Sequence, residues 1–147
     1  MSDDAPRYLH LVPNAPLPAA PFGGPFRAVV VVRRPVGDLW RKLASEWLVA
    51  GGCRYMLAWG HECSRWDDAV DWAALEANGF ADAPPERFVM TTWHEDEPLE
   101  AVFAYARRGA RHPALAPGET WIVEVCDPWA ASEPELRARW DAALDED

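Results

Sequence analysis

Several sequence features that would announce a known chemistry are missing from this chain. No G-x-G-x-x-G follows the first apolar run and no G-x-x-x-x-G-K-[ST] occurs, which argues against dinucleotide binding and P-loop chemistry. The three cysteines, Cys53, Cys63 and Cys126, have no C-x-x-C spacing, so we expect no disulfide framework. No apolar stretch has the length needed to cross a bilayer.

Positive charge is also scarce. Fourteen Lys and Arg residues face 24 Asp and Glu residues, which gives a formal net charge of −10. This balance argues against nucleic acid as a partner and favours a protein partner with a basic surface, with solubility as the simpler explanation. The segment Met1-Ser2-Asp3-Asp4 has neither the basic nor the apolar region of a signal peptide, so we expect a cytoplasmic protein without membrane association. The oligomeric state stays open.

What the chain does contain is enough apolar material for a core. Its 147 residues are 50% hydrophobic and include nine tryptophans, as expected for one folded domain. Residues 1–25 hold six prolines, and proline removes backbone donors and fixes φ. We therefore predict a proline-rich N-terminal arm over residues 1–25, in which Tyr8–Val12 could add an edge strand, and a single α/β domain over residues 26–147.

Short apolar runs alternate with helical stripes beyond this arm. Four strands are predicted, at residues 28–32, 54–59, 88–93 and 121–125. Between and after them, apolar residues recur with helical spacing, as in Trp40, Ala44 and Leu48. The alternation predicts a three-layer α/β sandwich with a four-stranded, mainly parallel sheet flanked by helices. The simplest strand order is 2-1-3-4, with the first and third strands central.

Polar residues follow these strands, and the carboxyl ends of parallel strands meet at one edge of the sheet. The predicted binding residues at this edge are Trp59, His61, Cys63, Trp93, His94, Glu95 and Asp127. We expect His61, Cys63, His94 and Asp127 to open onto one groove over the end of Val32. With the first strand between their own strands, His61 and His94 should have Cβ atoms about 10 Å apart.

Three of these residues could also carry catalysis. Cys63 precedes a predicted helix, where backbone N–H groups can stabilise a thiolate, and His94 or His61 could act as its base. The same set, His61, Cys63 and His94, could instead bind zinc, although its spacing matches no paired zinc motif. No cofactor is predicted, and the catalytic residues remain undetermined. A small hydrolase-type or metal-dependent enzyme is therefore the alternative to a non-catalytic binding module.

Two motifs in this region resemble a known family. Ala58-Trp59-Gly60-x-x-Cys63-x-x-Trp66-Asp67-Asp68 and Thr91-Thr92-Trp93-His94 are similar to motifs in a family of small uncharacterised bacterial α/β proteins. The resemblance spans residues 27–126 and implies one domain without implying an activity. With no complete catalytic motif, we expect a binding or regulatory module, for example an immunity-like protein, whose acidic, tryptophan-rimmed edge engages a partner.

Overall fold

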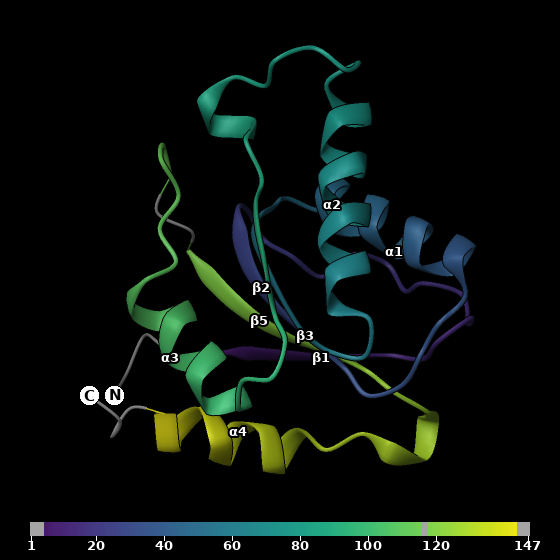
Figure 1. Ribbon diagram of the computed structural model, residues 1–147, viewed down its shortest axis with the longest axis vertical. Coiled ribbons are helices and arrows are strands. Elements are labelled where there is room, and N and C mark those ends of the chain that lie inside the picture. The colour runs from purple at the N-terminus through teal and green to yellow at the C-terminus, as the bar shows by residue number, and fades with distance from the viewer. Residues whose placement is uncertain (1–4, 116–117, 144–147) are drawn as a thin grey trace.

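The computed structural model describes residues 5–115 and 118–143 as a five-stranded, all-parallel sheet with helices on both faces (Figure 1). The ends of the predicted arm and domain, residues 1–4 and 144–147, lie outside the described residues. The strands are β1 (Arg7–Leu11), β2 (Phe26–Val32), β3 (Cys53–Gly60), β4 (Met90–His94) and β5 (Glu119–Val125). The helices are α1 (Asp38–Ala50), α2 (Cys63–Ala77), α3 (Leu99–Arg108) and α4 (Glu133–Ala142), with 3₁₀ turns at Pro85–Arg87 and Pro128–Ala130.

The predicted three-layer α/β architecture is confirmed, and its two cores lie on opposite faces of the sheet. Alternate residues of β2 point to opposite sides, so Val30 packs in one core and Val31 in the other. Helices α1 and α2 cover the face of Val30, and α3 and α4 cover the face of Val31 (Figure 1). All residues of β2 except Arg27 are completely or almost completely buried, as the β-branched run predicts for a central strand.

The predicted number and order of the strands were wrong. The sheet has the order β1-β5-β2-β3-β4, so the predicted second and third strands, β3 and β4, are hydrogen-bonded neighbours. Strand β4 lies at an edge because its sequence, Met-Thr-Thr-Trp-His, is too polar for the centre, and none of its residues is fully buried. The fifth strand, β1, comes from the proline-rich segment and pairs with β5 at the opposite edge.

The rest of the proline-rich segment packs against α1. The indole Nε1 of Trp40 donates to the Ala15 carbonyl at 2.7 Å, and that of Trp47 donates to the Pro18 carbonyl at 2.9 Å. The Phe22 ring stacks on Phe26 with ring centroids 3.9 Å apart. Indole donors therefore satisfy carbonyl groups of a segment whose prolines prevent it from forming a helix.

Candidate functional site

The polar residues at the carboxyl edge of the sheet surround a cavity of about 410 Å³. It lies where β3 and β4 end, since Trp59 and His94 are register partners on these strands. Four of its residues carry carboxylates, and the remainder include an aromatic wall, an imidazole and a thiol. The lining residues are Trp59, Gly60, Glu62, Cys63, His94, Glu95, Asp96 and Glu97. We refer to it as the acidic cavity.

A sharp turn between β3 and α2 forms one wall of the acidic cavity. Gly60 has φ +104°, and a Cβ at this position would lie 2.1 Å from the Val32 carbonyl oxygen. Only glycine fits such a close approach without shifting the backbone. The next residue, His61, donates its backbone N–H to that same oxygen at 3.0 Å. Glu62, at φ 55°, then precedes the first turn of α2. The turn thereby places the Glu62 side chain at the cavity.

Cys63 is the first residue of α2 and is only 2% exposed. Burial is the largest effect and raises the pKa of its thiol, a hydrogen bond with the His94 backbone lowers it, and the negative charge of Glu95 raises it. A buried thiol with a raised pKa stays protonated at neutral pH. These surroundings favour a packing role for Cys63 and give no support to an activated nucleophile.

His94 is held by two neighbouring side chains. Its Nε2 lies 2.9 Å from the Thr92 hydroxyl and its Nδ1 lies 3.1 Å from a Glu97 carboxylate oxygen. Trp59 is fixed in a similar way, because its indole Nε1 donates to the Glu97 carbonyl at 2.7 Å. The segment after β4 therefore positions both rings of the cavity through one residue, Glu97.

The structure gathers some of the predicted site residues and separates others. Trp59, Cys63, His94 and Glu95 line the acidic cavity. His61 is an exposed residue of the turn outside that lining. The first strand was predicted to lie between the strands of His61 and His94, which was wrong because β3 and β4 are adjacent. Trp93 is half-exposed and outside the lining, since neighbouring residues of a strand point to opposite faces.

Asp127 lies at the same edge of the sheet but away from the acidic cavity. It follows β5, which is on the far side of β2 from β3 and β4. Its carboxylate accepts from Arg34 at 2.7 Å. The predicted shared groove over the end of Val32 is therefore divided, with an Arg34–Asp127 ion pair on one side and the acidic cavity on the other.

Within residues 5–115 and 118–143, no three His, Cys, Asp or Glu side chains are arranged to hold a metal ion. Zinc at His61, Cys63 and His94 consequently gains no support from the geometry. In the same part of the chain, no helix combines the length and the apolar character required to traverse a bilayer.

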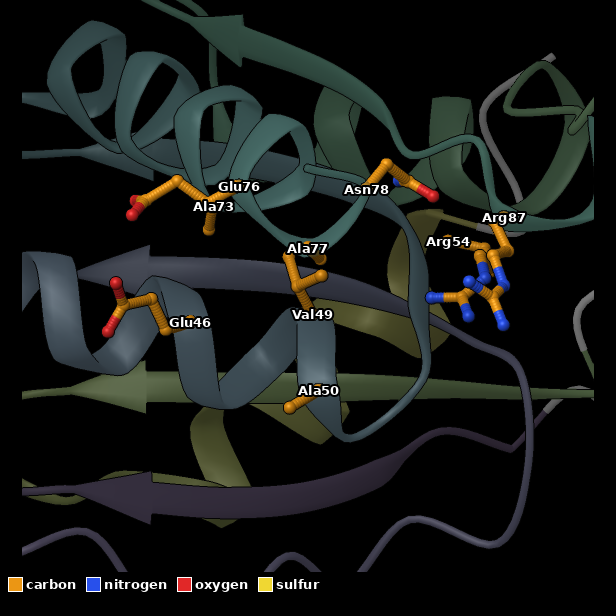
Figure 2. A pocket seen from close by; sticks show the side chains of 9 residues that line it. All are labelled: Glu46, Val49, Ala50, Arg54, Ala73, Glu76, Ala77, Asn78 and Arg87. Atoms are coloured by element: carbon orange, nitrogen blue, oxygen red, sulfur yellow. The ribbon is translucent and has the colours of Figure 1, made fainter. Parts of the chain in front are cut away.

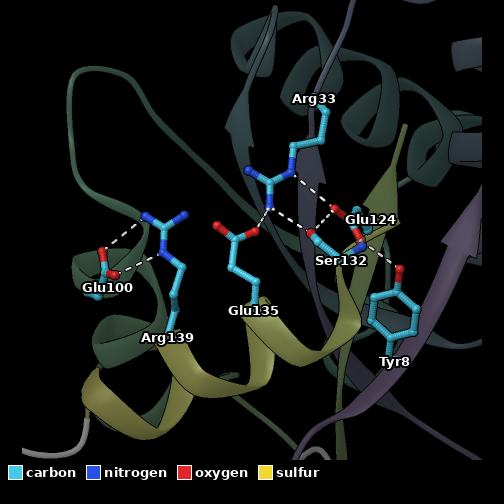
Figure 3. Close-up of polar contacts among 7 residues, drawn as sticks. All are labelled: Tyr8, Arg33, Glu100, Glu124, Ser132, Glu135 and Arg139. Carbon is cyan, nitrogen blue, oxygen red and sulfur yellow. Dashed lines mark hydrogen bonds and ion pairs between the residues drawn. The ribbon is translucent and has the colours of Figure 1, made fainter. Parts of the chain in front are cut away.

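A buried carboxylate beneath α4 is the main polar feature that the sequence analysis missed. Glu124 on β5 is 0% exposed and accepts hydrogen bonds from Tyr8, Ser132 and Arg33 (Figure 3). Burial alone would raise the pKa of Glu124, but these hydrogen bonds outweigh burial and hold the pKa below its usual value. The signal in the sequence is the single charge inside the run Trp121–Val125, whose apolar residues alone predict a buried strand.

A second buried acid lies on α2. Asp67 is 5% exposed, and burial together with the nearby Asp71 charge raises its pKa to about 6. The Thr91 hydroxyl of β4 lies 3.2 Å from Asp67 Oδ1 and 2.7 Å from Asp71 Oδ1. The other oxygen of Asp67, Oδ2, is buried and has no hydrogen-bond partner among the described residues. The ionised form of Asp67 is therefore poorly stabilised.

The fold and the site define a three-layer α/β protein with an acidic cavity at the carboxyl edge of a parallel sheet. The chain belongs to the family described as a domain of unknown function (DUF7684), whose model matches residues 6–142. No curated protein matches it. A solved structure titled "Crystal structure of an hypothetical protein" is 11% identical with a TM-score of 0.45, covering 85% of this chain and 75% of that chain. The function must therefore be argued from the site itself.

Proposed function

We propose that this protein is a non-catalytic binding module whose acidic cavity receives a basic side chain of a protein partner. The observation that carries this proposal is the presence of four carboxylate residues around a cavity of about 410 Å³, next to the Trp59 ring. Lysine and arginine are the side chains that such a set of carboxylates would attract. An immunity-like or regulatory protein would act in this way.

The charges of the acidic cavity are only partly neutralised from within. Glu62 lies 3.5 Å from Arg41 and 3.6 Å from Arg65. Glu95 and Asp96 are exposed, and neither forms an ion pair with a described side chain. Two carboxylates are thus free to bind a cation supplied by a partner. An overall charge of −10 would also steer a basic partner towards the protein and make association sensitive to salt.

Trp59 adds an apolar and aromatic surface to these charges. A long basic side chain can pack its methylene groups on an aromatic ring while its charged end reaches carboxylates. The protein itself contains such an arrangement, because the Arg139 guanidinium lies 5.8 Å from the centroid of the Trp59 ring. The same guanidinium also binds Glu100 (Figure 3). A partner's arginine would make the same two kinds of contact.

The surroundings of the candidate catalytic residues favour binding over nucleophilic catalysis. The Cys63 thiol is buried and its pKa is raised, so it lacks the thiolate that the enzymatic alternative requires. His94 is occupied by Thr92 and Glu97 rather than by Cys63. A Cys–His pair activated for catalysis would instead have its imidazole hydrogen-bonded to the thiol.

A direct binding experiment tests this proposal. A fluorescently labelled oligo-arginine peptide is titrated with the protein, with an oligo-glutamate peptide as the negative probe. The double variant Glu95→Gln/Asp96→Asn removes two charges at the acidic cavity, and Asn tolerates the positive φ of 59° at position 96. The control Asp82→Asn/Asp141→Asn removes two exposed charges elsewhere.

We expect the cavity variant to weaken oligo-arginine binding by about tenfold or more, because each lost charge-assisted contact is worth about 1.5 kcal/mol. The control should change the affinity by less than about threefold, since it affects only long-range screened charge. Equal weakening in the two double variants would show that net charge, and not the acidic cavity, attracts the peptide. That result, or failure of the wild-type protein to bind, would overturn the proposal.

A further inference from the structure

A second cavity, of about 440 Å³, lies near the amino ends of the parallel strands, between the carboxyl-terminal ends of α1 and α2 (Figure 2). Two arginines line one end of it. Arg54 is the second residue of β3, and Arg87 ends the 3₁₀ turn that precedes β4. Both therefore belong to the amino edge of the parallel strands, whereas the acidic cavity lies at the carboxyl edge. We call this second site the arginine cavity.

The two guanidinium groups have no carboxylate partner among the described residues. Arg54 is held by backbone carbonyls, donating from Nε to Glu86 at 3.1 Å and from Nη1 to Cys53 at 2.9 Å. The Arg87 side chain makes no hydrogen bond or ion pair with a described residue. Figure 2 shows both guanidinium groups at the same end of the cavity. Two positive charges thus share one cavity, and no described side chain supplies a counterion for them.

Arg54 and Arg87 lack a described carboxylate partner in a protein with 24 acidic and 14 basic residues. Several other arginines on the surface are paired, for example Arg34 with Asp127 at 2.7 Å and Arg137 with Glu133 at 2.9 Å. Like charges close together repel each other unless an anion lies between them. The arginine pair therefore has the electrostatic character of an anion-binding site.

The remaining walls of the arginine cavity are apolar or already neutralised. Val49 and Ala73, 9% and 4% exposed, provide apolar surface between its two ends. At the far end, Glu46 and Glu76 lie 2.5 and 3.9 Å from the ammonium nitrogen of Lys42. The acidic end thus has a cation of its own, whereas the basic end has no carboxylate of its own among the described side chains.

We propose that the arginine cavity binds a small organic anion, with a carboxylate or phosphate group on Arg54 and Arg87 and a short apolar body on Val49 and Ala73. Guanidinium groups recognise the oxygens of both anions through paired hydrogen bonds. The volume lies in the range of small-molecule sites, which are apolar with a few polar groups that fix orientation. This inference goes beyond the proposed function, because the site and its ligand are separate from the acidic cavity.

Calorimetric titration with defined probes tests this inference. The probes are hexanoate and hexyl phosphate, which distinguish the two anions, hexanol, which lacks the charge, and inorganic phosphate, which lacks the apolar body. Arg87→Gln removes one guanidinium that forms no hydrogen bond or ion pair with a described residue, so the variant should fold normally. Arg7→Gln is the matched control, because Arg7 is exposed and lies on β1, the edge strand farthest from β4.

We expect at least one of the two alkyl anions to bind at millimolar concentrations, and both hexanol and inorganic phosphate to bind more weakly. Arg87→Gln should weaken that binding about tenfold or more, the effect of losing a charged hydrogen-bond donor, while Arg7→Gln leaves it within about twofold. Equal loss in the two variants would overturn the proposal, as would absence of saturable binding for both alkyl anions. Equal binding of inorganic phosphate and hexyl phosphate would contradict the apolar part of the assignment.

Discussion

Replacement of Glu124 by Gln should be among the most damaging changes of a single charge in this protein. The carboxylate is fully buried, and its two oxygens accept from the Tyr8 hydroxyl at 2.6 Å, from Ser132 N–H and hydroxyl at 2.8 and 2.6 Å, and from Arg33 Nε at 3.1 Å. The donors come from β1, from the residue after β2 and from the start of α4 (Figure 3). One carboxylate therefore connects three segments that are distant in sequence.

The size of the destabilisation follows because an amide cannot accept all the hydrogen bonds that the carboxylate accepts at this position. Gln has nearly the same shape, but its NH₂ group would face donors where one carboxylate oxygen now accepts. The Arg33 side chain, 26% exposed, would lose a charged partner. Removing one member of a buried ion pair costs about 3–5 kcal/mol. Since domains have unfolding free energies of about 5–15 kcal/mol, the Glu124→Gln variant should remain folded but with a small unfolding free energy.

Urea denaturation followed by tryptophan fluorescence measures this cost. With about 2 kcal/mol per molar of urea, a loss of 4 kcal/mol lowers the midpoint by about 2 M. Glu135→Gln is the control, because Glu135 binds the same Arg33 at 3.2 Å but is 56% exposed, and an exposed pair is worth at most about 1 kcal/mol. A midpoint for Glu124→Gln that equals that of Glu135→Gln would refute the argument that burial makes this carboxylate important.

The pH dependence of the unfolding free energy provides a second test of Glu124. Because the folded-state pKa of Glu124 lies below its usual value of 4.5, its contribution to stability is complete above that value and is lost as the pH falls through the folded-state pKa. The difference in unfolding free energy between wild type and Glu124→Gln should accordingly narrow below about pH 4.5. A difference that stays constant into strongly acidic solution would contradict the assignment of an ionised Glu124.

Two further predictions concern α2. The pKa of Asp67 is raised to about 6 from 3.8, so the folded state binds this proton more tightly than the unfolded chain and loses stability as the pH rises through this range. Relative to Asp67→Asn, the wild-type unfolding free energy should therefore fall by about 2–3 kcal/mol between pH 4 and pH 8. If the difference in unfolding free energy between the two proteins did not change with pH, the raised pKa of Asp67 would be disproved. For Cys63, burial and a raised pKa predict slow reaction with a thiol reagent in the native state at pH 7 and fast reaction in denaturant, whereas rapid native labelling would restore the nucleophile hypothesis.

Local patterns in the sequence were sufficient to predict most of the elements. The run from Ala28 to Val32 is a buried central strand, and the stripe of Trp40, Ala44 and Leu48 packs on the sheet as the helical period indicates. These predictions succeed because the period of apolar residues depends on backbone geometry alone. The helices and strands therefore follow from residues that are close together in the chain.

Strand order could not be obtained in the same way. Neighbouring strands in a parallel sheet are joined through crossovers, and several orders leave the same faces buried. The polar sequence of β4, with Thr91, Thr92 and His94, was a usable sign of an edge strand, and the order 2-1-3-4 ignored it. That error also misplaced the site, because the acidic cavity exists only where β3 and β4 are adjacent.

The sequence by itself therefore determined the class of fold and the edge of the sheet at which polar residues gather. Only the tertiary structure decided which of them meet, namely Trp59, Cys63, His94 and Glu95 at the acidic cavity, with Asp127 paired elsewhere. It also decided that Arg54 and Arg87, 33 positions apart, share a second cavity. The physical reason is that patterning specifies which face of an element is buried, whereas convergence of side chains depends on the packing of elements that are remote in the chain.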